Sequence, residues 1–94
     1  MAMDLKYNHH TLQKIEDVLK SNIYTIRYEK GRFNAGYCLV HEKKVIIINK
    51  FFDTEARIHC LLEILEQVTI DTTLFDDQKL EKFYLSVLPK KALA

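Results

Sequence analysis

Four side chains with binding chemistry fall on one face of the antiparallel sheet that residues 23–50 predict: Arg27, Asn34, Cys38 and Asn49. A guanidinium and two carboxamides are strong hydrogen-bond donors toward the oxygens of a carboxylate or another anion. Gly36 falls among them and leaves its backbone bare, because glycine has no side chain. The four residues therefore predict a shallow binding patch for an anion or a carboxylate.

Cys38 is the candidate nucleophile of this patch, because the neighbouring Arg27 would lower the pKa of its thiol. Nucleophilic catalysis also needs a general base within hydrogen-bonding reach. His41 lies three residues further along the same strand, and residues three apart on a strand point to opposite faces. No catalytic residue is therefore assigned, and the sequence does not favour an enzyme.

Metal-ligating residue types occur in two groups of the sequence. The first is Cys38, His41, His59 and Cys60. Cys38 and His41 diverge on their strand, whereas structural zinc sites use closely spaced Cys/His pairs on loops or turns. The second group is Glu55, His59 and Glu63, at i, i+4 and i+8 of a predicted helix. This spacing is equally typical of a solvated helix face, so we expect no bound metal and no cofactor.

The strands that position the patch are inferred from two turns. Lys30-Gly31 and Glu42-Lys43 predict two consecutive hairpins, with Tyr28 opposite Phe33 and with Val40 opposite Val45. One face, called face one below, carries Tyr24, Ile26, Tyr28, Phe33, Ala35, Tyr37, Leu39, Ile46 and Ile48. The other, called face two, carries Thr25, Arg27, Asn34, Gly36, Cys38, Val40, Val45, Ile47 and Asn49. Face one should be buried, because all its members are apolar or tyrosine.

Helices are predicted on both sides of the strands, over residues 4–21, over residues 53–68 and from Asp76 or Asp77 to Val87. The fold class is therefore α+β, a three-stranded antiparallel sheet of two consecutive hairpins packed by helices, in the order α-β-β-β-α-α. The 94 residues make a single domain, 1–94. The longest apolar run, Val45 to Ile48, is too short to cross a membrane. With two distant cysteines and no secretory signal, we expect a cytoplasmic protein.

Two resemblances can be read from these segments. Glu29 to Cys38 fit the pattern E-K-G-x-F-x-x-G-Y-C, Val45 to Lys50 fit V-I-I-x-N-K, and a leucine-rich helix follows. In this the chain resembles a group of short, uncharacterised bacterial proteins, which implies an autonomous domain and no particular chemistry. The order of helix, sheet and helix is also similar to that of zincin metallopeptidases. Their H-E-x-x-H motif would fall on Leu62, Glu63 and Glu66, so both zinc-binding histidines are missing.

Three functions remain open at this point. A non-catalytic interaction or regulatory module is favoured, because the apolar strip and polar rim of face two resemble an interface. Either the last helix covers face two, with Phe83 and Tyr84 on Ile47, or a second protein chain does, with a homodimer the expected partner. The alternatives are an anion-binding protein and a single-stranded nucleic-acid binder. The latter is not favoured, because residues 23–50 are basic but the whole chain carries a net charge of only +1.

Overall fold

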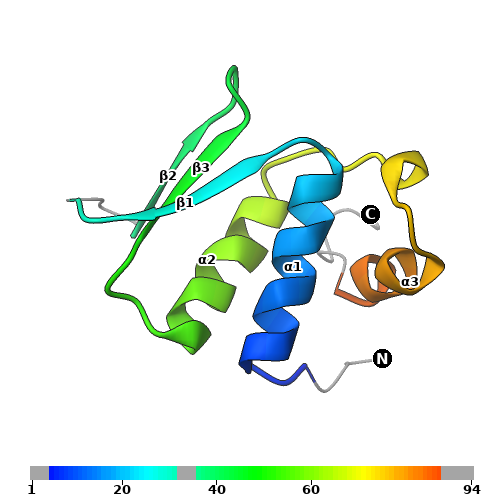
Figure 1. Ribbon diagram of the computed structural model, residues 1–94, viewed down its shortest axis with the longest axis horizontal. Coiled ribbons are helices and arrows are strands. Elements are labelled where there is room, and N and C mark those ends of the chain that lie inside the picture. The colour runs from blue at the N-terminus through cyan, green and yellow to red at the C-terminus, as the bar shows by residue number, and fades with distance from the viewer. Residues whose placement is uncertain (1–4, 32–35, 88–94) are drawn as a thin grey trace.

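The computed structural model describes residues 5–31 and 36–87, and these residues form an α+β fold (Figure 1). In chain order its elements are α1 (His9–Ser21), β1 (Thr25–Glu29), β2 (Tyr37–Val40), β3 (Val45–Asn49), α2 (Thr54–Leu65), the 3-10 turn η1 (Thr72–Leu74) and α3 (Gln78–Val87). The predicted α+β class and element order are confirmed, whereas the sheet is not the predicted antiparallel one. Within the described ranges no helix has the length and apolar character needed to cross a membrane.

Side-chain caps set where the helices begin. The Asn8 carboxamide accepts a hydrogen bond from the Thr11 N–H at 2.9 Å, and α1 starts directly after Asn8, at His9. Asp53 caps α2 in the same way, accepting from the Ala56 N–H at 2.9 Å, as the sequence predicted. Asp4, the expected cap of the first helix, lies outside the described residues. The second helix ends at Leu65, three residues before its predicted end.

A Schellman motif ends α1 and turns the chain into β1. The Tyr24 N–H donates to the Leu19 carbonyl at 3.1 Å, and the Ile23 N–H donates to the Lys20 carbonyl at 2.9 Å. The motif requires a left-handed residue after the cap, and here Ile23 takes it with φ 70°. Glycine adopts this conformation freely, whereas a side chain with a Cβ costs about 1–2 kcal/mol. The end of α1 is therefore sterically strained.

The sheet order is β1-β3-β2, which corrects the predicted pair of consecutive hairpins. The second hairpin is confirmed in register, from Tyr37 opposite Ile48 to Val40 opposite Val45. The first hairpin is wrong, since β1 pairs with β3 in parallel, from Thr25 beside Val45 to Glu29 beside Asn49. The sheet is consequently mixed, and Lys30-Gly31 is not the two-residue turn of a hairpin.

Burial explains why β3 and not β2 takes the central position. β3 holds the continuous apolar run Val45 to Ile48, and a central strand pairs on both edges and is the least accessible to water. Ile46 and Ile48 are both 0% exposed there. β1 carries the charged residues Arg27 and Glu29, which suit the edge of a sheet.

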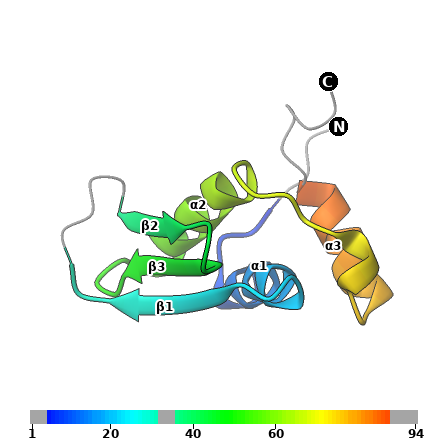
Figure 2. The same ribbon diagram turned by 90° about the horizontal axis from the view of Figure 1, so that it is seen from above.

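The predicted faces survive the change of neighbour for the strand residues that the structure describes. Ile46 lies between Ile26 and Leu39, and Ile48 lies between Tyr28 and Tyr37, so these face-one residues stay together. Phe33 and Ala35 of face one, and Asn34 of face two, lie outside the described residues. Helices α1 and α2 cover face one, and the core forms where their buried side chains meet the sheet (Figure 2).

Helix α3 packs against α1 and lies beyond it, away from the sheet (Figures 1 and 2). Its buried Phe83 receives the Lys14 ammonium at 5.5 Å from the ring centroid. Its Tyr84 meets Phe75 edge to face, with the ring centroids 5.8 Å apart. The alternative in which the last helix covers face two, with Phe83 and Tyr84 on Ile47, therefore does not hold, because α3 packs against α1 instead.

Candidate functional site

Arg27 and Cys38 lie on face two, as predicted, but they are not neighbours. Ile47 of the central strand stands between them, paired with Arg27 on one side and with Cys38 on the other. Two strand spacings separate the outer strands, roughly 9–10 Å. Arg27 instead forms an ion pair with the carboxylate of Glu29, two residues along the same strand. The guanidinium therefore already has an anionic partner.

Asn49 lies at the carboxyl end of β3 and uses its side chain locally. Its Oδ1 accepts a hydrogen bond from the Phe51 N–H at 3.0 Å, which turns the chain out of the strand. In the sheet it stands beside Glu29, whose carboxylate would repel a bound anion. Asn34 lies outside the described residues. The described members of the predicted patch thus do not converge on a common point.

Face two is instead a largely apolar surface. Val45 and Ile47 of β3 and Cys38 and Val40 of β2 lie in adjacent rows and are half-buried. Figures 1 and 2 place α1 and α2 on the opposite side of the sheet, so the helices of the described ranges leave face two uncovered. A sheet face in contact with water normally carries polar side chains at such positions. The apolar strip is therefore unusual for a solvated face.

A polar network that the sequence reasoning missed ties face one to the helices. The Tyr28 hydroxyl donates to the Glu16 carboxylate of α1. The Arg57 guanidinium of α2 lies over the Tyr28 ring, 4.2 Å from its centroid. The Tyr37 hydroxyl donates to Glu63 at 2.9 Å. Two tyrosines on a face predicted to be core were the available signal, because a buried hydroxyl needs a partner.

This network has a structural role and lacks an activated group. Burial and the hydrogen bond to Glu16 raise the pKa of Tyr28 far above the ordinary 10.0. Burial also raises the pKa of the nearby Cys60 thiol, and the Glu63 carboxylate adds to this. Both groups hold their protons at neutral pH, so neither is prepared to act as a nucleophile or a base.

Tyr28→Phe should lower the free energy of unfolding by about 1 kcal/mol near neutral pH, because it deletes one half-buried hydrogen bond to a carboxylate. The raised pKa also has a consequence at high pH. Above the ordinary value of 10.0 an unfolded tyrosine loses its proton while folded Tyr28 keeps it, so wild-type stability falls as the pH rises. The variant should lose less stability over that range in urea unfolding from pH 7 upward. Tyr7→Phe, at an exposed ring, is the control; equal pH profiles for wild type and Tyr28→Phe would contradict the expectation.

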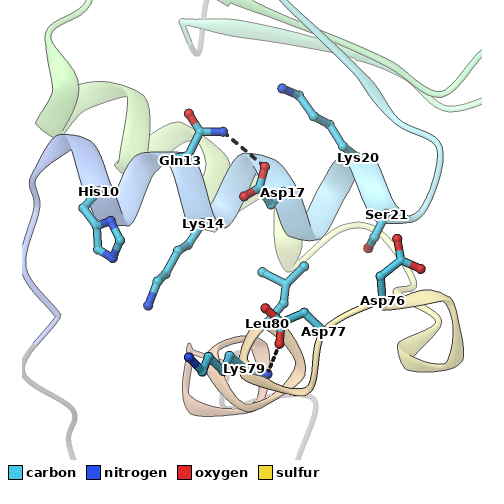
Figure 3. A pocket seen from close by; sticks show the side chains of 10 residues that line it. All are labelled: His10, Gln13, Lys14, Asp17, Lys20, Ser21, Asp76, Asp77, Lys79 and Leu80. Atoms are coloured by element: carbon cyan, nitrogen blue, oxygen red, sulfur yellow. Dashed lines mark hydrogen bonds between the residues drawn. The ribbon is translucent and has the colours of Figure 1, made fainter.

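A groove of about 560 Å³ lies between α1 and the start of α3 (Figure 3). The described residues that line it are His10, Gln13, Lys14, Asp17, Lys20, Ser21, Asp76, Asp77, Lys79 and Leu80. Small-molecule pockets are mostly apolar with a few convergent polar groups, whereas Leu80 is the one large apolar side chain in this set. Asp17 accepts from Gln13 at 3.1 Å, Asp77 accepts from the Lys79 N–H at 2.8 Å, and Lys20 extends away from α3. The groove is a solvated seam between two helices.

The metal-ligand types of the sequence do not gather either. Among residues 5–31 and 36–87, no three His, Cys, Asp or Glu side chains are placed to hold one ion. His59 lies against the Tyr7 ring, with the centroids 4.8 Å apart. Glu63, from the same helix row, receives the Tyr37 hydroxyl.

Fold and surface together define a small α+β domain whose mixed three-stranded sheet has one helix-covered face and one apolar face that the described helices leave open. Comparison with protein-family models, with curated proteins and with solved structures finds no match to the chain. The functional argument therefore rests on the surface of this molecule.

Proposed function

We propose that this chain is a non-catalytic interaction module that associates with a second copy of itself through face two. The observation that carries the proposal is the apolar strip on the open side of the sheet, above all Val45 and Ile47 of the central strand. Apolar side chains in adjacent rows form the kind of core that a protein interface buries, and the polar residues beside them form its rim. An interface would remove this strip from water.

Charge favours a second copy as the occupant. Arg27 and Glu29 lie on face two of the same edge strand, one cationic and one anionic. In a twofold pair the same patch is used by both partners, and the two patches do not repel each other because each Arg27 is already paired with its own Glu29. The chain carries a net charge of only +1, so two copies repel each other little. A strongly charged partner would find no surface of uniform sign here.

The two alternatives have less support from the described residues. An anion site would have to break the ion pair of Arg27 with Glu29. Nucleic-acid stacking needs exposed aromatic rings, and Tyr28 is half-buried under Arg57. Phe33, another aromatic ring of the basic segment 23–50, lies outside the described residues. Cys38 and Cys60 are free thiols, which accords with a reducing compartment such as the cytoplasm.

Ile47→Asp should convert the dimer to monomer, because it places a carboxylate at the centre of the apolar strip. The dimer dissociation constant should rise by roughly 100-fold or more, as for the loss of a central interface residue. Analytical ultracentrifugation over a range of concentrations measures it, and circular dichroism checks the fold. Leu85→Asp, at an exposed leucine of α3, is the matched control and should leave association unchanged.

Ile47→Thr provides a second variant that keeps a β-branched side chain in the strand. It should weaken association by a smaller factor of about 5 to 10, the range expected for the loss of part of one apolar contact. A wild-type protein that stays monomeric at high concentration would refute the proposal. So would an equal response of the dimer to Ile47→Asp and Leu85→Asp.

A further inference from the structure

Ile23 combines two properties that folding does not explain. It takes the left-handed position of the Schellman motif at φ 70°, where a β-branched residue is an outlier. Its side chain is 71% exposed, so little packing offsets the strain. Such motifs are usually accompanied by an apolar contact across the turn, and the two residues in those positions, Leu19 and Tyr24, are both buried in the core cluster without Ile23. Glycine at this position would satisfy the backbone without the strain.

The position of Ile23 relates it to the open sheet face. Ile23 lies two residues before β1, and Thr25, the first residue of β1, lies on face two beside Val45. The Thr25 N–H donates to the carbonyl of Lys44 at 2.9 Å, so the start of β1 meets the residue before β3 at this corner of the sheet. Ile23 therefore lies close in the chain to the corner where Thr25 pairs with Val45 of the apolar strip, at the amino ends of the two parallel strands.

We propose that Ile23 is an apolar contact of the interface between two copies of this chain, retained for association at the expense of the fold. The inference rests on the proposed function and extends its surface beyond the strands to the corner where α1 ends. Strained, exposed residues are characteristic of binding sites, because only function maintains them. Because Ile23 lies next to the first strand of face two, its expected contact is with the second copy of the chain.

The inference predicts opposite effects of one substitution. Ile23→Gly should stabilise the monomer, because it relieves the left-handed strain, and should weaken the dimer, because it removes an apolar contact. Monomer stability is measured in the Ile47→Asp background, where association does not contribute to the melting temperature. In that background Ile23→Gly should raise the melting temperature by about 4 °C or more. In the wild-type background Ile23→Gly should raise the dimer dissociation constant about 10-fold.

Lys44→Gly is the matched control, because Lys44 is also left-handed, at φ 52°, and lies at the same corner. It should relax the backbone and leave the dimer dissociation constant within about twofold of wild type. If Ile47→Asp dissociates the dimer but Ile23→Gly leaves it intact, this inference fails and the proposed function stands. A fall in the melting temperature with Ile23→Gly would also overturn the inference. A monomeric wild type would overturn both.

Discussion

Leu61→Ala should lower the free energy of unfolding by about 2–5 kcal/mol. Leu61 lies in the middle of α2 and is 0% exposed, within the cluster that joins both large helices to the sheet. Truncation removes its buried methyl groups and leaves a cavity that the close-packed side chains of the core fill only in part. Urea unfolding followed by circular dichroism gives the difference directly.

Leu62→Ala is the matched control for this experiment. It is the same substitution one residue further along the helix, at a half-buried position on the margin of the core. The loss there should be clearly smaller, because water already reaches part of the side chain. Equal losses for the two variants would contradict the packing of α2 on face one.

Gly36→Ala should cost about 2–5 kcal/mol, from two separate causes. Gly36 has φ +81°, a conformation that costs a residue with a Cβ about 1–2 kcal/mol. A Cβ built at this position also lies 2.6 Å from Cζ of Phe52, so the ring would have to move. Overpacking of this kind typically adds about 1–3 kcal/mol.

A double variant separates these causes. In Gly36→Ala with Phe52→Ala the contact with the ring is gone but the left-handed strain remains. The double variant should therefore lose less stability than the sum of the losses of the two single variants, measured as a double-mutant cycle by urea unfolding. Gly31→Ala, at an exposed glycine of the connection after β1, should cost less than Gly36→Ala. A loss of stability for Gly36→Ala no greater than that for Gly31→Ala would contradict the close packing of Gly36 against the Phe52 ring.

The candidate surface was only partly predictable. Alternation placed Arg27, Cys38 and Ile47 on the same face, and that placement is correct for the described strands. Their distances depended on which strands are neighbours, and there the predicted order was wrong. With β3 between the outer strands, an apolar side chain separates Arg27 from Cys38. The described residues of the predicted polar patch other than Cys38 lie instead at the rim of an apolar strip.

Ile23 gave no signal in the sequence at all. An isoleucine between a helix and a strand is usually read as a strand residue or a core residue. Its left-handed backbone and its exposure appear only once the Schellman hydrogen bonds and the position of Tyr24 are known.

The sequence by itself determined the features that depend on near neighbours in the chain. Asp53 starts α2 because its carboxylate reaches an N–H three residues on, and the turn at residues 41–44 sets β2 against β3 in register. The faces of the strands were determined as well, because side chains alternate with a period of two whichever strand lies alongside.

Only the tertiary structure decided which strand is central and where the last helix packs. β1 can form hydrogen bonds with either neighbour, so the choice depends on burying the most apolar strand, β3, between the other two. In the same way, the last helix with its Phe83 and Tyr84 could have covered face two or α1, and it packs against α1. Both choices are competitions for buried apolar area among distant segments, and the local pattern of a sequence does not rank such competitors.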